Sequence, residues 1–362
     1  MVPTRAATLA NSCANTYYHP VPDSLVPRPV TARDVAARAG VSQPTVSLVL
    51  SGNPTARLSP ETRARVKRAA RELGYRPNVA ARGLARGRSY ALGILVPDLG
   101  NPFFADVASG AQRVAAEEGY AVLLAEAREV EPSRHLEALR ARRVDGIIID
   151  AVGASDLDPD LLAGFNVVLI DEPSTRWPGV ASDALGAGRV AADHLLSLGH
   201  RRLAFMGPAI DVHTFRQRER GFTGTLRAAG VTLSSAALQR ARPTVGGGQD
   251  AMRALLAMPE RPTGVFCAND LMALGALKAC ARAGVAVPGA VSIVGCDDVE
   301  LARVVTPELT TIAIPARELG ARAARMLARQ LDGTGKRVAG SRPLPVTLKV
   351  RGTSGPAPKD LA

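Results

Sequence analysis

The 362-residue sequence predicts an N-terminal all-α unit followed by a larger α/β unit. Three observations predict this division. Apolar residues recur at helical spacing between Thr31 and Gly74, whereas beyond Tyr90 short apolar runs alternate with helical stretches. Strands that are apolar throughout and separated by helices are typical of parallel sheets covered by helices on both faces. The third observation is charge, because the basic residues are concentrated in the first unit.

The charge distribution indicates a phosphate-rich partner for this first unit. The chain carries a net charge of +12, and the segment from Arg28 to Tyr90 holds thirteen Lys or Arg residues against three acidic ones. The 272 positions after Tyr90 hold 31 basic and 29 acidic residues. Charge that served only solubility would be spread evenly, so its concentration predicts nucleic acid as the leading partner.

The composition also excludes several classes of protein. No apolar run approaches the ~20 residues that a membrane-spanning helix needs. Residues 1–28 contain no continuous apolar segment, so we expect no secretory signal and a cytoplasmic location. The four cysteines form no C-x-x-C pair, and we expect buried small apolar groups rather than disulfides or zinc ligands. They are Cys13, Cys267, Cys280 and Cys296.

The first two helices of the basic segment are predicted from their caps. Thr31 is an N-cap with Asp34 three residues later, and Gly40 can take the left-handed conformation that ends a helix. Ser42 caps a second helix, and Pro44 falls in its first turn, where a missing N–H costs nothing. A tight glycine turn therefore joins two short helices.

A third helix is predicted from Ser59 to Gly74, with apolar residues at Val66, Ala69 and Ala70. Two short helices joined by a tight turn and supported by a third predict a helix-turn-helix DNA reader. The alternative is a basic three-helix bundle that binds a protein or nothing.

Three blocks of sequence resemble, in order, the DNA-binding headpiece of the LacI/GalR family of bacterial transcription regulators. They are DVAARAGVSQPTVSLVL (Asp34 to Leu50), LSPETRARV (Leu58 to Val66) and ELGYRPNVAARGLARGRS (Glu72 to Ser89). The resemblance implies that the second helix enters the major groove of DNA. It places Gln43, Pro44 and Leu48 at base-facing positions, and Arg33, Ser42, Thr45 and Ser47 near phosphates. Of the base-facing residues only Gln43 is a good hydrogen-bonding side chain, suited to adenine.

The segment after Pro77 resembles the hinge helix of the family, which pairs with its dimer mate and inserts a leucine into the minor groove. Leu84 matches the leucine, and Asn78 is an N-cap. Gly83 weakens a helix of about eight residues that is too short to form alone. A disordered linker is therefore the alternative for the DNA-free state, and both interpretations can hold in different states.

The larger unit is predicted to consist of two Rossmann-like subdomains, as in periplasmic-binding proteins. Predicted strands are 91–96, 122–124, 146–149, 167–170, 203–206, 264–267 and 291–294. Predicted helices lie near 103–118, 132–142, 185–198, 216–229, 249–257, 270–283 and 316–331. Ligands of such folds bind at the carboxyl ends of the strands, in the cleft between the halves.

Polar residues follow the predicted strands and indicate such a cleft. They are Asp98, Asn101, Asp150, Asp171, Asn269, Asp270, Asp297 and Asp298. Taken singly, each fits a helix N-cap or a loop residue better than a ligand contact, but together they indicate a cleft rich in hydrogen-bonding groups. The family resemblance extends to about Thr353 and implies that Asp171, Arg218, Asn269 and Asp297 contact the effector, with Asn101, Phe103 and Phe104 at the mouth of the cleft. Arg218 and Asp297 together suit vicinal hydroxyls or a polar heterocycle, and we expect a sugar.

These observations predict a repressor without enzymatic activity, cofactor or metal, since no phosphate loop, nucleophile elbow or zinc spacing occurs. It would bind a palindromic operator as a dimer, or as a tetramer, under the control of a small molecule. Alternatives are a regulator that senses a nucleobase or phosphosugar, and a sugar-binding protein without DNA function. The expected segments are a disordered extension (1–28), the helix-turn-helix domain (29–76), the hinge (77–89), the effector and dimerisation domain (90–355) and a tail (356–362).

Overall fold

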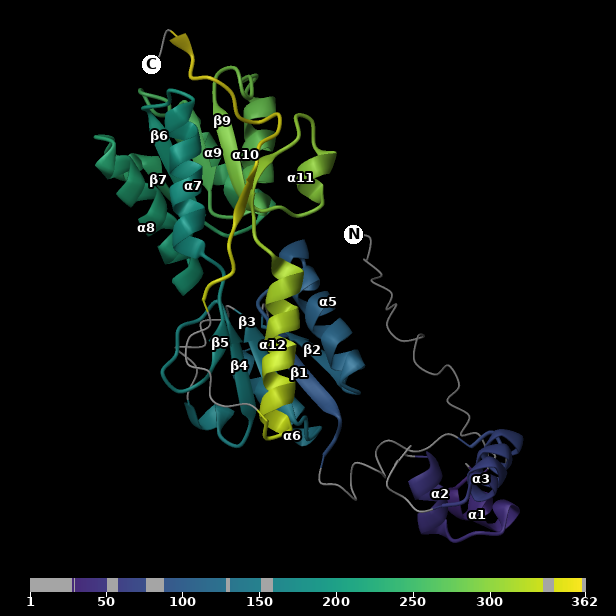
Figure 1. Ribbon diagram of the computed structural model, residues 1–362. Coiled ribbons are helices and arrows are strands. Elements are labelled where there is room, and N and C mark those ends of the chain that lie inside the picture. The colour runs from purple at the N-terminus through teal and green to yellow at the C-terminus, as the bar shows by residue number, and fades with distance from the viewer. Residues whose placement is uncertain are drawn as a thin grey trace, which may run out of the picture. The chain divides into compact units, whose positions relative to one another are not determined.

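The computed structural model in Figure 1 divides into two compact units, residues 1–82 and 83–362. Each unit is described by itself. The residues described are Arg28, 30–50, 58–75, 88–127, 131–150, 159–334 and 342–359. Within them no helix is long and apolar enough to cross a membrane.

The first unit is the predicted helix-turn-helix. Its helices are α1 (Ala32–Ala39), α2 (Gln43–Leu50) and α3 (Pro60–Glu72). The predicted caps are confirmed: Thr31 and Asp34 form a capping box, and Gly40 ends α1 at a φ of 62°. A small core of Val35, Val46, Val49, Val66 and neighbouring alanines holds the three helices together, while Leu50 is only half-buried.

The second unit contains two parallel sheets, as predicted (Figure 1). The first sheet has the order β2-β1-β3-β4-β5. Its strands are β1 (Ala91–Val96), β2 (Ala121–Glu126), β3 (Gly146–Asp150), β4 (Asn166–Ile170) and β5 (Gly179–Val180). Its helices are α5 (Pro102–Glu117), α6 (Pro132–Ala141) and α12 (Ala316–Leu331), with a 3-10 turn at Pro159–Leu162. Helices α5 and α12 cover one face, and α6 covers the other.

The second sheet has the order β11-β10-β9-β8-β6-β7, and only β11 is antiparallel. Its strands are β6 (Leu203–Pro208), β7 (Leu238–Ala241), β8 (Gly264–Cys267), β9 (Ser292–Asp297), β10 (Thr310–Ala313) and β11 (Thr347–Lys349). Its helices are α7 (Ala184–Ser197), α8 (His213–Ala228), α9 (Val245–Leu256), α10 (Asp270–Arg282) and the short α11 (Leu301–Val304), with a 3-10 turn at Ser235–Ala237. Helices α7 and α8 pack on one face of this sheet, and α9 and α10 on the other.

The seven predicted strands and seven predicted helices of this unit are all present, with small shifts of their ends. Strands β5, β7, β10 and β11 were not predicted. Three of the predicted buried cysteines, Cys267, Cys280 and Cys296, are buried and free, whereas Cys13 lies outside the described residues.

Glycines set the distance between the helices of each packed pair. A Cβ on Gly188 of α7 would overlap the carbonyl oxygen of Arg218 on α8, and one on Gly221 of α8 would overlap that of Leu185 on α7. The same reciprocal arrangement joins α5 to α12 and α9 to α10. The glycines of those pairs are Gly110 with Gly320 and Gly248 with Gly275.

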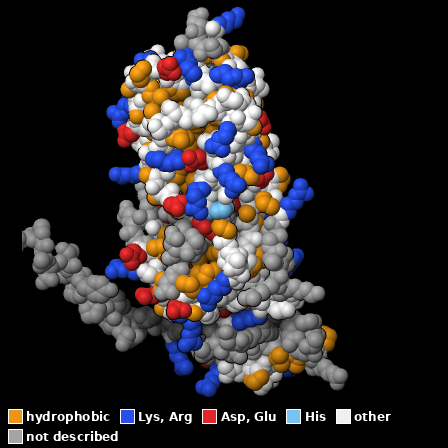
Figure 2. Space-filling model, turned by 90° about the vertical axis from the view of Figure 1, so that its left-hand side faces the viewer, with side chains coloured by type: hydrophobic (Ala, Val, Ile, Leu, Met, Phe, Trp, Pro, Cys, Tyr) orange, Lys and Arg blue, Asp and Glu red, His pale blue; other side chains and the backbone are white. Residues whose placement is uncertain are grey.

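On the face of the larger unit in Figure 2, basic side chains stand beside acidic and apolar ones. On this face side chains of both signs are therefore mixed.

We expect Gly221→Ala to lower the free energy of unfolding by about 1–3 kcal/mol, because the added methyl group must push α7 away from α8. Gly224→Ala, on the same helix, is the matched control. Its Cβ would meet no atom within 4 Å. Because alanine loses less conformational entropy on folding than glycine does, this substitution should raise the free energy of unfolding by up to about 1 kcal/mol. Urea titrations followed by circular dichroism measure both values, and equal effects would contradict the proposed packing.

Candidate functional site

One face of α2 packs on the core of the first unit, and the other face is exposed to solvent. Val46 and Val49 point into the core, while Gln43, Pro44 and Leu48 are exposed. Because the core side of the helix is anchored by two valines, the exposed side has a defined orientation. The three residues expected to face bases therefore share the outward face of one helix.

Of the residues expected near phosphates, Ser42 and Thr45 lie at the start of α2, Ser47 lies one turn further along it, and Arg33 lies on α1. The Ser42 hydroxyl accepts from the backbone N–H of Thr45 at 3.4 Å and lies 2.9 Å from the Thr45 hydroxyl. Arg33 and Ser47 are exposed. A helix N-terminus that carries two hydroxyls suits a phosphate. The expected hinge residues Asn78 and Leu84 lie outside the described residues.

A cleft lies in the second unit between its two sheets. In the first sheet the strand order reverses between β1 and β3, and in the second it reverses between β6 and β8. Such reversals open a crevice beyond the carboxyl ends of the strands. Pro97 and Asp98 after β1 line the cleft from one side, and Asn269 and Asp297 after β8 and β9 line it from the other.

The walls of the cleft are apolar. Phe103 and Phe104, in the first turn of α5, form an edge-to-face pair with ring centroids 5.2 Å apart. Ile210, Val212 and Phe215 contribute from the opposite subdomain. The free space is only about 70 Å³, well below the roughly 300–1,000 Å³ of ligand pockets. The structure therefore shows the two subdomains closed upon each other.

Arg218 is the central polar group of the cleft. Its side chain is 3% exposed and reaches from α8 to the Asp297 carboxylate, with 3.2 Å between Nη1 and Oδ1. The same nitrogen donates to the carbonyl of Ala268 at the end of β8, and the guanidinium lies over the Phe215 ring. Its Nε atom is buried without a hydrogen-bond partner, so the guanidinium retains one donor for a ligand.

Asp171 and Asp297 both end strands with a left-handed backbone. Their φ angles are 57° and 129°, which cost about 1–3 kcal/mol each in residues other than glycine. Strain of this kind is found where the surroundings fix a side chain in place. Burial raises the pKa of both carboxyls, although the hydrogen bonds from Ser182 oppose the shift at Asp171 and the charge of Arg218 opposes it at Asp297.

Asp171 also connects the subdomains. Its carboxylate accepts from the backbone N–H of Ser182 at 2.6 Å and from the Ser182 hydroxyl at 3.0 Å. Ser182 lies where the chain leaves the first sheet for α7, and it bridges to Leu344. The Thr214 hydroxyl of α8 donates to the Asp171 carbonyl at 3.1 Å. The end of β4 is thereby tied both to a crossing segment and to the opposite subdomain.

Asn101 and Asn269, both expected as ligand contacts, serve as N-caps. Asn101 Oδ1 accepts from the N–H of Phe103 at 3.1 Å, and Asn269 Oδ1 accepts from that of Met272 at 2.8 Å. The Asn269 amide also donates to the carbonyl of Pro243. The capping interpretation thus holds for both, and only their remaining amide donors are open to a ligand.

The structure adds cleft residues that the resemblance did not supply, namely Ile210, Val212, Thr214, Phe215 and Pro243. The sequence offered no signal for them, because they lie in a turn or at a helix start. Asp150 was noted only as a polar residue at a strand end. It is fully buried, and neither carboxylate oxygen has a hydrogen-bond partner.

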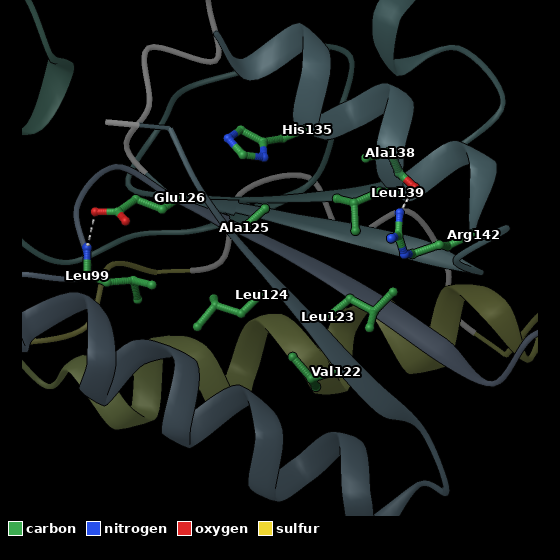
Figure 3. A pocket seen from close by; sticks show the side chains of 10 residues that line it. All are labelled: Leu99, Val122, Leu123, Leu124, Ala125, Glu126, His135, Ala138, Leu139 and Arg142. Carbon is green, nitrogen blue, oxygen red and sulfur yellow. Dashed lines mark hydrogen bonds between the residues drawn. The ribbon is translucent and has the colours of Figure 1, made fainter. Parts of the chain in front are cut away.

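A larger hollow, of about 770 Å³, lies away from the cleft beside the edge strand β2. Figure 3 shows Leu123, Leu124, His135 and Leu139 lining it, with Glu126 accepting from the N–H of Leu99. Size alone would make this hollow the ligand site. We favour the cleft, because it lies beyond the carboxyl ends of both parallel sheets and holds the buried ion pair of Arg218 and Asp297.

Comparison with known proteins identifies the family. Residues 31–78 match the model of bacterial regulatory proteins of the lacI family, and residues 192–354 match a periplasmic binding protein-like domain. The transcriptional repressor CytR of Escherichia coli (strain K12) is 34% identical over 336 residues, which cover 91% of this chain and 97% of the relative. The chain belongs to the lacI family. This confirms the resemblance stated from the sequence.

Solved structures of the lacI family agree with the fold. The Lac repressor dimer, bound to operator and the anti-inducer ONPF, has a TM-score of 0.81 at 28% identity and covers 91% of this chain and 100% of its own. The complex of the regulator CelR with cellobiose has a TM-score of 0.68 at 32% identity and covers 90% and 100%. The first of these relatives is bound to an operator and a small molecule, and the second to cellobiose. This lacI-family chain has the corresponding helix-turn-helix and periplasmic binding protein-like domains.

Proposed function

We propose that the protein is a repressor that reads its operator through the outward face of α2. The single observation that carries this proposal is the exposed set Gln43, Pro44 and Leu48 on a helix anchored by Val46 and Val49. Gln43 is the only one of the three that can make paired hydrogen bonds to a base edge, and adenine is the base it suits. Arg33, Ser42, Thr45 and Ser47 hold the helix on the phosphates.

Gln43→Ala should weaken binding to the operator by about 1–3 kcal/mol and leave binding to scrambled DNA nearly unchanged, because only base contacts carry sequence information. Arg33→Ala is the matched comparison. This variant should lose the same amount of affinity for both DNAs. The slope of log affinity against log salt concentration should become smaller by roughly one unit. Fluorescence anisotropy titrations at two salt concentrations measure both effects. Equal losses on both DNAs for Gln43→Ala contradict its role.

The effector is proposed to be a sugar bound in the cleft. Apolar walls from Phe103, Phe104 and Phe215 suit the flat faces of a sugar ring, while the open donor of Arg218 suits its hydroxyls. Asn269 and Asp297 line the same space, with Asn101 at the mouth. Asp171 is buried behind this lining, where its carbonyl accepts from the hydroxyl of the lining residue Thr214. The CelR relative crystallised with cellobiose supports the sugar class. A phosphosugar is disfavoured, because the carboxylates in the cleft outnumber Arg218.

In wild type, one of ribose, glucose and cellobiose should change operator affinity by roughly 5- to 150-fold, the usual range of allosteric coupling. Arg218→Ala should abolish this change, because it removes the donors of the cleft and leaves Asp297 unpaired. Arg220→Ala, an exposed arginine on the same helix, should retain it. If a sugar acts equally on Arg218→Ala and on wild type, or if no sugar acts at all, the proposed site or ligand class is wrong.

A homodimer is proposed to form along the edge strand β2, which would place two headpieces on a palindromic operator. Leu99 is 39% and Leu124 is 45% exposed there, beside a strand edge that has no partner strand among the described residues. Such an edge is normally covered. The likeness to a Lac repressor solved as an operator-bound dimer supports a second copy of this chain as the cover.

Leu124→Asp should weaken self-association at least about tenfold, because dimerisation would bury an unpaired charge. Sedimentation velocity over a concentration series measures the monomer–dimer equilibrium. Ala236→Asp, an exposed change on the other subdomain, should leave it unaltered. A dimer of unchanged strength in Leu124→Asp excludes this edge as the interface.

A further inference from the structure

Asp150 is the one buried carboxyl of the cleft region that the described structure leaves wholly unpaired. Its side chain is 0% exposed, and both carboxylate oxygens lack a hydrogen-bond partner. An ionised carboxylate in that position costs several kcal/mol unless something pairs with it. No structural role offsets this cost, since Asp150 neither caps a helix nor bonds to a neighbouring strand through its side chain.

Asp150 lies at the carboxyl end of the first sheet, behind the lining of the cleft. It ends β3 at the strand-order reversal of the first sheet, where it pairs in register with Ile170 of β4. Alternation along β3 puts its side chain on the same face as Ile148, toward the core under α5 and α12. Because the group is fully buried in the closed structure, a ligand reaches it only when the two subdomains part.

The surroundings of Asp150 are acidic. Asp171 and Glu172 follow the neighbouring strand β4, and Asp297 comes from the opposite subdomain. Arg218 is a buried cation of this region, and it already pairs with Asp297. Burial holds the pKa of Asp150 well above its usual range, and these three carboxylates add to the effect. Burial and these neighbouring charges therefore favour the neutral acid over the carboxylate until a partner arrives.

We propose that the effector is a ring compound carrying a protonated amine, such as an amino sugar, and that its ammonium group pairs with the Asp150 carboxylate. An ammonium supplies donors to both unpaired oxygens and balances the excess of carboxylates, which a hydroxyl cannot do. On binding, Asp150 transfers its proton to solvent, so the gain of one positive charge accompanies the release of one proton. This inference rests on the proposed sugar function of the cleft and narrows it.

The test compares compounds that differ only at one group. Glucosamine and galactosamine are paired with glucose and galactose, and glucose 6-phosphate serves as the anionic member. We expect an amine to bind wild type at least about tenfold more tightly than its hydroxyl counterpart, and the phosphate not to bind. Titration calorimetry in two buffers of different ionisation enthalpy should show about one proton released for each amine bound.

Asp150→Asn, which keeps the shape of the side chain, should remove both the preference for the amine and the proton release. Asp193→Asn, an exposed change on α7, is the control that should retain both. Asp150→Ser is a second variant, in case the buried amide disturbs folding. A preference that persists in both Asp150 variants, or equal binding of amine and hydroxyl compounds to wild type, overturns the proposal.

A readout without ligand tests the unpaired carboxyl itself. A raised pKa in the folded protein means that wild type loses stability as pH rises above the ordinary range of an aspartate. The melting temperature of Asp150→Asn relative to wild type should therefore increase from pH 5 to pH 8, and a constant difference would overturn this step.

Failure of this inference is distinguishable from failure of the cleft as a ligand site. If glucose or galactose binds wild type, Arg218→Met abolishes that binding and amines show no advantage, the cleft stands and Asp150 is not the selecting group. If none of these compounds binds wild type but ribose or cellobiose does, only the amine proposal falls. If those two sugars also fail to bind, the sugar function falls with it.

Discussion

The close contact between α7 and α8 fixes the position of Arg218, and the chemistry of the cleft depends on it. Gly188 lets the carbonyl of Arg218 approach α7 to a distance that any Cβ would prevent. The side chain of the same residue reaches Asp297 and Ala268. A shift of α8 by the width of one methyl group would move the guanidinium away from both partners. The orientation of the Arg218 guanidinium therefore depends directly on the packing of α7 against α8.

The elements that the sequence predicts are those whose signal is local. Apolar runs such as Ile147 to Ile149 mark buried central strands, and caps such as Thr31 and Gly40 mark helix ends. The strands that were not predicted lack this signal. β7 (Leu238–Ala241) is a partly exposed edge strand with Gln239 and Arg240 at its centre. β10 begins with Thr310 and Thr311, whose hydroxyls are buried only because Ser354 and Asp270 pair with them. Those partners are distant in sequence.

The candidate site shows the same limit. The family resemblance supplies Arg218, Asp171 and Asp297, but it does not say what each carboxylate bonds. The Asp171 carboxylate accepts hydrogen bonds from Ser182, and the amide oxygen of Asn269 accepts the hydrogen bond that caps α10. Asp150, by contrast, reads as an ordinary polar residue after a strand until the structure shows that nothing pairs with it. Whether a polar group is satisfied depends on neighbours brought by the fold, so no pattern along the chain reports it.

The closed cleft also bears on how a ligand can act. The free space of about 70 Å³ admits no sugar, so the closed state and the entry of a ligand exclude each other. The hydrogen bond from Thr214 to the Asp171 carbonyl joins the subdomains across this closed cleft. A buried hydrogen bond contributes about 1 kcal/mol, comparable to the lower end of allosteric coupling energies. A ligand that replaces such cross-cleft bonds with its own can therefore reset the angle between the subdomains. Ser182 and Leu344 pair where the chain crosses between the subdomains. A change of the angle between the subdomains therefore moves these two crossing segments directly.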